Sequence, residues 1–224
     1  MSGYIVIEGV IGVGKTTLTK FLSKDFNAQQ YYEIVEDNPF LSHFYLDKQK
    51  FAFDTEIFFL LARFRQQREL EYSLQKKEKM LVCDYLFDKN KIFAQINLSA
   101  EDFRIFSLVF YGIHSKIISP NLVIYLRSDV STLMKRIQDR DRPFERNMDE
   151  KYIATLCRQY DAFFETYKAS DILVIDTTNL DFVARPQDYQ AIKEQITKKI
   201  NIYKGEPSSS AKATEDRQDD MMRI

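Results

Sequence analysis

The sequence predicts a three-layer α/β/α fold, in which a five-stranded parallel sheet lies between two layers of helices. Short apolar runs alternate along the chain with longer segments whose apolar residues recur at helical spacing. The 224 residues are 45% hydrophobic, which is enough for the core of one large domain. A glycine-rich turn joins the first apolar run to the first helical segment.

Five segments are expected to be strands, and four of them end in a carboxylate. They are Tyr4–Glu8, Tyr31–Glu36, Met80–Asp84, Leu122–Arg127 and Ile172–Asp176. Ligands bind at the carboxyl ends of strands in open α/β sheets, so acids there are expected beside a phosphate and its metal. Strand-end acids also occur as helix caps, and the pattern alone leaves both roles open.

Helical patterns follow these strands, and most of them carry a start signal. The expected helices are Lys15–Lys24, a long helix from about Phe51 to Lys76, Ala100–Ile118 capped by Ser99, Val130–Asp139 opened by Ser128 and Asp129, a helix from Asp149 to about Ala169, and a last helix from Pro186 to Tyr203.

The pattern predicts one domain over residues 1–204. From Gly205 the composition becomes polar and loses apolar periodicity, which predicts a disordered tail over residues 205–224. The net charge of −1 gives no global attraction for nucleic acid polymers.

Cys83 and Cys157 show no C-x-x-C spacing, which fits a reducing compartment. We find no signal-peptide pattern and no apolar run of membrane-spanning length. We therefore expect a cytoplasmic protein that binds neither nucleic acid polymers nor membranes.

Residues 9–16, GVIGVGKT, form a complete phosphate-binding loop (P-loop) of the pattern G-x-x-x-x-G-K-[ST]. The loop lies between the first strand and its helix, where backbone N–H groups and the helix N-terminus attract phosphate. Lys15 is expected to reach the β- and γ-phosphates, and Thr16 to bind Mg²⁺. The expected nucleotide contacts of this segment are Gly9, Gly12, Gly14, Lys15, Thr16 and Thr17. A GTPase would normally add an N-K-x-D motif, which the sequence lacks.

A phosphotransferase also needs cations for the charge on the transferred group. Arg136 and Arg140 share a helix face, and Arg142 and Arg146 continue into a segment that Pro143 breaks. We interpret this segment as a mobile lid whose arginines close on phosphates. The alternative is a solvated helix end, since three acidic residues interleave with the arginines.

The acceptor side is expected in the middle of the chain. Glu36 ends the second predicted strand, where it could act as a general base. Tyr45, Glu56 and Arg63 lie among phenylalanines, a mixture that fits a planar, hydrogen-bonding base. For most of these phenylalanines, an ordinary core position is the simpler interpretation.

In these residues the sequence resembles the deoxynucleoside kinase family, and most closely its bacterial deoxyadenosine/deoxyguanosine kinase branch. The resemblance covers about residues 3–200. It rests on the P-loop, EDNPF at 36–40, Tyr45 ahead of FAF at 51–53, the helix with Glu56 and Arg63, CDY at 83–85, the segment from Arg136 to Glu145, and Asp176 with Asp181-Phe182.

The resemblance implies a role for each of these residues. Glu36 resembles the base that takes the proton from the 5′-hydroxyl, and Tyr45 with Glu145 resembles the pair that holds the sugar 3′-hydroxyl. The remaining implied roles are base reading by Glu56 and Arg63, lid arginines at Arg136, Arg140 and Arg142, a substrate- and metal-side acid at Asp84, and donor adenine contacts at Asp181 and Phe182. The family also implies a homodimer.

The sequence departs from the family pattern at two places. Many members have glutamine where Glu56 stands, and a carboxylate can only accept hydrogen bonds unless it is protonated. Many members also have an arginine directly after the acid at Asp84, where this chain has tyrosine. Lys89, Lys91 or a lid arginine are candidates to replace it, and Asp88 is a candidate partner for Arg63.

The expected activity is transfer of the γ-phosphoryl group of ATP, with Mg²⁺, to the 5′-hydroxyl of deoxyadenosine or deoxyguanosine in nucleotide salvage. The alternative enzyme is a thymidylate-type nucleoside monophosphate kinase. Such an enzyme needs cations for an acceptor phosphate, and Arg63 is the one arginine in segment 36–63. A nucleotide-binding regulator without turnover is a third class, and it would need no base such as Glu36.

Overall fold

A computed structural model of the chain has the predicted architecture, and it describes residues 3–35, 37–76, 79–146 and 148–205. Within these residues, five parallel strands form one sheet in the order β2-β3-β1-β4-β5. The strands are β1 (Tyr4–Gly9), β2 (Gln29–Tyr31), β3 (Leu81–Cys83), β4 (Leu122–Arg127) and β5 (Asp171–Asp176). The predicted tail falls almost entirely outside the described residues.

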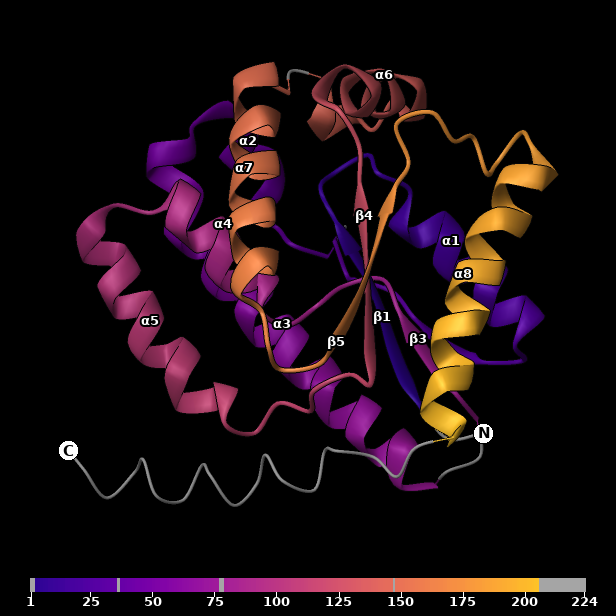
Figure 1. Cartoon of the computed structure of the whole chain (residues 1–224). Helices are drawn as coiled ribbons and strands as arrows, with labels where there is room; N and C mark the ends of the chain where they lie inside the picture. The colour runs from indigo at the N-terminus through magenta and orange to yellow at the C-terminus, as the bar shows by residue number, and fades with distance from the viewer. Residues whose placement is uncertain (1–2, 36, 77–78, 147, 206–224) are drawn as a thin grey trace.

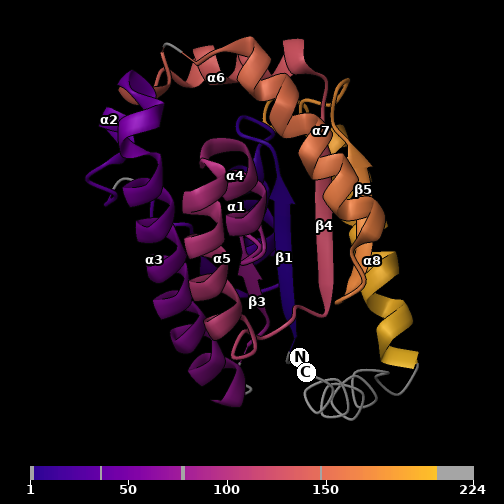
Figure 2. The same ribbon diagram turned by 90° about the vertical axis from the view of Figure 1, so that its left-hand side faces the viewer.

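Helices cover both faces of this sheet (Figure 1). The helices are α1 (Lys15–Asp25), α2 (Leu41–Leu46), α3 (Lys48–Lys76), α4 (Lys89–Asn97), α5 (Ala100–His114), α6 (Val130–Arg140), the 3-10 helix η1 (Pro143–Glu145), α7 (Glu150–Thr166) and α8 (Pro186–Gly205). Helix α1 packs on β1 and β3, and α8 packs on β5. Helices α3, α4, α5 and α7 lie on the opposite side (Figures 1 and 2).

The central strands lie in the middle of the main hydrophobic core. All residues of β1 and β3 are buried, as expected for parallel strands covered by helices on both faces. Helix α6 lies across the carboxyl edge of the sheet, next to α7 (Figure 2). This arrangement leaves the loops after β1, β2 and β3 facing α2, α3 and α6. No helix in the described part of the chain is long and apolar enough to cross a membrane.

The second strand differs from its predicted range of Tyr31–Glu36, because it spans only Gln29–Tyr31. Its partner β3 ends at Cys83, and the next residue continues the contact through its side chain. Asp84 Oδ1 accepts a hydrogen bond from the Glu33 backbone N–H at 2.6 Å. The chain therefore leaves the sheet after Tyr31 and turns Glu33 toward the carboxyl edge.

Two α-helices are shorter than predicted, and two further α-helices are not predicted. Helix α5 begins after the Ser99 cap, as expected, but ends at His114 rather than at Ile118. Helix α7 ends at Thr166 rather than at Ala169. The unpredicted helices are α2 and α4, and α4 supplies several of the pocket residues described below.

Candidate active site

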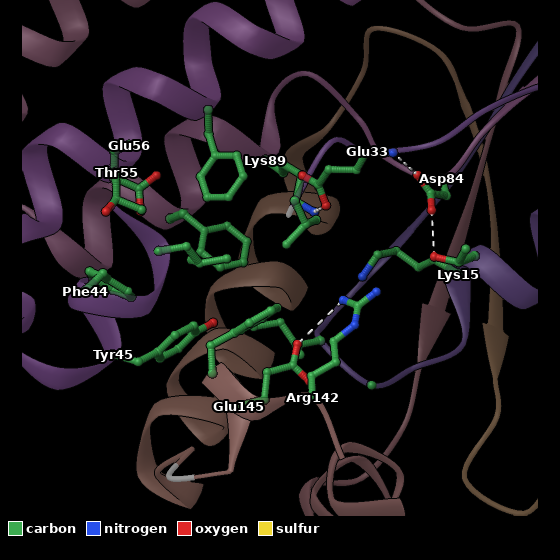
Figure 3. A pocket seen from close by; sticks show the side chains of 18 of the residues that line it. Lys15, Glu33, Phe44, Tyr45, Thr55, Glu56, Asp84, Lys89, Arg142 and Glu145 are labelled. Atoms are coloured by element: carbon green, nitrogen blue, oxygen red, sulfur yellow. Dashed lines mark hydrogen bonds and ion pairs between the residues drawn. The ribbon is translucent and has the colours of Figure 1, made fainter. Parts of the chain in front are cut away.

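A pocket of about 250 Å³ lies at the carboxyl edge of the sheet. Figure 3 shows Lys15 and Asp84 on one side of it and Glu56 and Phe44 on the other. The polar residues that line it are Lys15, Thr16, Tyr32, Glu33, Tyr45, Thr55, Glu56, Arg63, Asp84, Lys89, Asn97, Arg140, Arg142, Glu145 and Tyr152. One cavity therefore contains the P-loop lysine and most of the predicted acceptor residues.

Two P-loop glycines are required by the backbone. Gly12 and Gly14 have φ angles of 85° and 102°, which L side chains rarely adopt. A Cβ atom on Gly12 would lie 2.9 Å from the Leu133 carbonyl oxygen, and one on Gly14 would lie 2.6 Å from the Phe182 ring. The loop can thus follow its tight path only with glycine at these positions. Of the predicted nucleotide contacts, Gly9, Gly14 and Thr17 do not line the pocket.

The Lys15 side chain folds back onto the P-loop backbone. Its Nζ donates hydrogen bonds to the carbonyl oxygens of Gly9 at 2.7 Å and Val10 at 3.2 Å. Burial, with a smaller contribution from the nearby Lys89 ammonium, lowers the pKa of Lys15 to about 8. An anion in the pocket would favour the charged form of this lysine.

Thr16 and Asp84 meet at the mouth of the P-loop. Thr16 Oγ1 donates a hydrogen bond to Asp84 Oδ2 at 2.6 Å. One hydroxyl and one carboxylate fit Mg²⁺, which takes oxygen ligands and completes its shell with substrate phosphates and water. No group of three or more His, Cys, Asp or Glu residues in the described part of the chain could hold a metal.

Glu33 lies at the centre of a charged cluster in the pocket. Its Oε1 accepts a hydrogen bond from Arg63 Nε at 2.8 Å and another from Arg63 Nη2. Its Oε2 accepts a hydrogen bond from Lys89 Nζ at 2.9 Å. Burial opposes ionisation of Glu33, but the attraction of Lys89, Arg63 and Lys15 outweighs it and holds the pKa well below its usual range. Glu33 is therefore an ionised carboxylate between the P-loop and the far side of the pocket.

The predicted sugar-holding pair, Tyr45 and Glu145, lines the same pocket. Glu145 is buried and accepts a hydrogen bond from Arg140 Nη2 at 2.6 Å. Arg142 Nη1 lies 3.8 Å from the other carboxylate oxygen of Glu145. Burial raises the pKa of the Tyr45 hydroxyl, and the Glu145 charge adds to the rise. Tyr45 is thus a neutral hydrogen-bonding group.

Three residues predicted to contact the nucleotide have other partners. Arg136 donates hydrogen bonds to the carbonyl oxygens of Thr177 and Leu180, so its guanidinium supports the loop after β5 instead of the pocket. The Asp181 carboxylate accepts hydrogen bonds from the backbone N–H groups of residues 183 and 184. Phe182 is only 4% exposed and packs against Gly14. Its ring therefore packs in the core beneath the P-loop, and the adenine contact stays a prediction.

The strand-end carboxylates have different roles. Glu8 is fully buried and accepts hydrogen bonds from the Gly9 and Leu86 backbone N–H groups at 2.8 and 2.6 Å, which makes it a structural residue. Asp84 faces the pocket. Asp176 accepts a hydrogen bond from the Thr178 backbone N–H, as a cap does. Glu36, the predicted base, lies outside the described residues.

Lys89 and Lys91, two candidates to replace the arginine that is absent after Asp84, lie in different places. Lys89 reaches Glu33, whereas Lys91 donates a hydrogen bond to the Tyr111 hydroxyl away from the pocket. The suggested pairing of Asp88 with Arg63 is wrong, because Asp88 Oδ1 lies 2.8 Å from His114 Nε2. Sequence reasoning also misses several pocket residues, among them Glu33, Asn97 and Tyr152. For Glu33 there is a signal, since it lies in the same EIVE run as Glu36.

Comparison with known proteins agrees with this geometry. A family model described as deoxynucleoside kinase matches residues 5–201. The deoxyguanosine kinase of Bacillus subtilis (strain 168) is 33% identical over 201 residues, covering 88% of this chain and 97% of the relative. The deoxyadenosine kinase of Lactobacillus acidophilus (strain ATCC 700396 / NCK56 / N2 / NCFM) is 29% identical over 212 residues, covering 88% and 95%.

A solved structure has the same fold. It is the deoxyadenosine kinase of M. mycoides with bound dATP, which matches with a TM-score of 0.76 and 26% identity. The match covers 87% of this chain and 99% of that chain. The likeness thus extends over nearly the whole of the described domain.

Proposed function

Because this chain belongs to the deoxynucleoside kinase family, we propose that it transfers the γ-phosphoryl group of ATP to the 5′-hydroxyl of a purine 2′-deoxynucleoside. It is an ATP-dependent phosphotransferase, and its named relatives favour a nucleoside over a monophosphate as acceptor. One observation carries the proposal: an ionised carboxylate, Glu33, and the P-loop lysine, Lys15, face a single pocket.

In this mechanism Glu33 takes the part that the sequence alone suggested for Glu36. The acceptor 5′-hydroxyl donates a hydrogen bond to the Glu33 carboxylate, which Lys89 and Arg63 hold in place. The hydroxyl oxygen forms a bond to the γ-phosphorus while the bond to the β-phosphate oxygen breaks, and ADP leaves. The hydroxyl proton passes to Glu33 as the bond forms. Because the transition state is loose, a base of low pKa is sufficient to orient the hydroxyl and receive its proton.

The remaining groups stabilise the donor and the sugar. Lys15 turns from its loop carbonyls to the β- and γ-phosphates, and Arg140 and Arg142 approach from α6 and its C-terminal loop as a lid. Tyr45 and Glu145 hold the sugar 3′-hydroxyl. Thr16 and Asp84 would hold Mg²⁺, which when bound would neutralise part of the phosphate charge.

Helix α5 has an exposed apolar face that could be covered by another molecule. Helix α5 exposes apolar side chains, with Leu108 at 71% and Tyr111 at 57% exposed. We propose that a second copy covers this face in a homodimer, a state that light scattering on wild type and Leu108→Glu would test.

Cys83 and Cys157 are both free thiols, which fits the cytoplasm as the compartment.

A coupled assay of ATP consumption tests the function directly. The panel consists of the four 2′-deoxynucleosides and their 5′-monophosphates, each with ATP and Mg²⁺. We expect turnover with purine deoxynucleosides and none with the monophosphates. Turnover with a monophosphate alone would instead identify the thymidylate-type alternative, and ATP binding without any turnover would identify a regulator.

A further inference from the structure

Glu56 has one carboxylate oxygen that lacks a hydrogen-bond partner among the described residues. It lies on α3 with only 2% of its surface exposed. Its Oε1 accepts a hydrogen bond from Asn97 Nδ2 at 2.7 Å, whereas the buried Oε2 accepts none. A buried acceptor without a partner costs free energy, so this end of the pocket is short of a donor that a ligand could supply.

The unpaired oxygen belongs to the end of the pocket where a base would lie. Figure 3 shows Glu56 beside Thr55 and Phe44, across the pocket from Lys15 and Asp84. Phe44, Phe59 and Tyr152 line the pocket with it, and flat aromatic walls fit a planar ring. A nucleoside whose 5′-hydroxyl meets Glu33 can therefore direct the edge of its base toward Glu56.

The chemistry of a carboxylate distinguishes among the bases. An ionised carboxylate only accepts hydrogen bonds, and its two oxygens lie side by side. Guanine presents two adjacent N–H donors on one edge, N1–H and the N2 amine. Adenine and cytosine each present one donor beside a ring nitrogen that is an acceptor, and thymine presents one donor between two carbonyl oxygens. Guanine is thus the DNA base that can pair with both carboxylate oxygens.

We propose that Glu56 selects guanine, by accepting hydrogen bonds from N1–H and the N2 amine of deoxyguanosine. This inference rests on the proposed function and names the base that the function leaves open. The ring-nitrogen acceptor of adenine would face a carboxylate oxygen of Glu56, which is also an acceptor. That carboxylate oxygen would then remain without a hydrogen-bond donor. Sites built for a particular hydrogen bond reject ligands that cannot form it.

The guanine O6 and N7 acceptors also have donors available. Arg63 has five N–H groups, and three of these donate to Glu33 and Asn90, which leaves two. Arg63 lies seven residues after Glu56 on α3, two helical turns along the same face. Its free N–H groups are available to acceptors on a base held in this pocket.

Glu56 can also change its protonation state near neutral pH. Burial raises its pKa to about 7, against the opposing effects of the Asn97 hydrogen bond and of the Arg63 and Lys89 charges. Glu33, Tyr45 and Tyr152 also face it, and the Glu33 charge adds to the rise. A protonated Glu56 presents one donor and one acceptor, the pair that adenine requires. Guanine preference should therefore strengthen as pH rises and weaken as pH falls.

The test is kcat/KM with ATP for deoxyguanosine, deoxyadenosine and 2′-deoxyinosine, measured on wild type and Glu56→Gln. For wild type we expect the ratio of deoxyguanosine to deoxyadenosine to rise at least about 10-fold between about pH 6 and pH 8.5. Deoxyinosine lacks the N2 amine, so at the higher pH it should fall about 10- to 100-fold below deoxyguanosine. Groups that titrate alike for all substrates, including Lys15, cancel in these ratios.

Glu56→Gln replaces one acceptor by a donor and removes the titration. Its ratio of deoxyguanosine to deoxyadenosine should fall at least about 10-fold at the higher pH and lose its pH dependence. Glu71→Gln is the matched control, because Glu71 is exposed on the same helix and should leave the ratios unchanged. The wild-type pH series and the deoxyinosine comparison need no variant, so they test guanine selection even if Glu56→Gln fails to fold.

Different results would overturn different parts of the account. A wild type that prefers deoxyadenosine at the higher pH, or a preference unchanged by pH and by Glu56→Gln, would refute guanine selection and leave the kinase function intact. A wild type that phosphorylates no deoxynucleoside would overturn the proposed function and this inference together.

Discussion

Lys89 Nζ donates a hydrogen bond to Glu33 Oε2 at 2.9 Å, which joins α4 to the segment after β2. Lys89 Nζ also lies 4.0 Å from Glu8 Oε1, so one ammonium group lies between the buried Glu8 carboxylate and the partly exposed Glu33 carboxylate. A cation is thus present beside the proposed base, although the residue directly after Asp84 is a tyrosine. In the proposed mechanism, Lys89 positions Glu33 for the acceptor hydroxyl.

Replacement of Lys89 tests this positioning role. Lys89→Met keeps most of the side-chain volume but removes the charge-assisted hydrogen bond to Glu33. We expect kcat/KM for the deoxynucleoside to fall about 10- to 100-fold, mainly through kcat. Lys89→Arg, which keeps the charge, should recover much of the loss. A loss confined to KM, or an arginine variant as impaired as the methionine variant, would contradict the positioning role.

Glu33 and Glu36 can be compared directly as candidates for the base. Glu33→Gln keeps the shape of the side chain but cannot receive the proton. We predict that its kcat falls by about 10²- to 10⁴-fold with little change in nucleoside affinity. Glu36→Gln is the matched variant three residues later, and its kcat should remain near that of wild type. The reverse outcome would restore Glu36 as the base.

The 3′-hydroxyl tests the pairing of Tyr45 with Glu145. A substrate without this hydroxyl loses the hydrogen bonds to both groups, although Glu145 keeps its contact with Arg140, and each lost bond costs about 1–3 kcal/mol. We therefore expect 2′,3′-dideoxynucleosides to be poor substrates by kcat/KM. The double variant Tyr45→Phe with Glu145→Ala should lose most of the discrimination, mainly because it harms the natural substrate. Equal use of both sugars by wild type would remove these residues from the sugar site.

A substitution of Phe182 tests whether its ring has a packing role or contacts the donor adenine. Because its ring is buried against Gly14, Phe182→Ala should lower the free energy of unfolding by about 3–5 kcal/mol. Urea denaturation of the variant measures this change. Val183→Ala is the control, since that neighbouring side chain is 65% exposed and should have little effect. Unchanged stability with a raised KM for ATP would instead support the adenine contact.

The sequence predicts strands and helix starts well where apolar patterning and capping residues indicate the same element. The fourth strand, Leu122–Arg127, has the predicted bounds because a continuous apolar run is buried on both faces. The caps at Ser99, Asp129 and Asp149 also form as expected. These features depend on residues that are neighbours in the sequence, so the sequence alone is enough to predict them.

The features it does not predict depend on distant contacts. Helix α4 begins after Asp88, which forms no side-chain cap because it contacts His114, and two lysines lie in its first turn. Such a start carries no recognisable signal. Glu33 reaches the pocket because Asp84, a residue of another strand end, ends the β2 pairing. Likewise, the length of Arg136 permits either a phosphate contact or the observed loop contact, and only the fold decides.

The central claim is transfer of phosphate to the 5′-oxygen of a deoxynucleoside by a site in which Glu33 and Lys15 face the same pocket. Its most direct test identifies the product formed from γ-labelled ATP and deoxyguanosine, by chromatography against 3′- and 5′-monophosphate standards and by phosphorus NMR. We predict labelled 5′-dGMP from wild type, with the rate reduced about 10³-fold or more in a folded Lys15→Ala variant. Label on any other oxygen, or an unchanged rate in Lys15→Ala, would contradict the account.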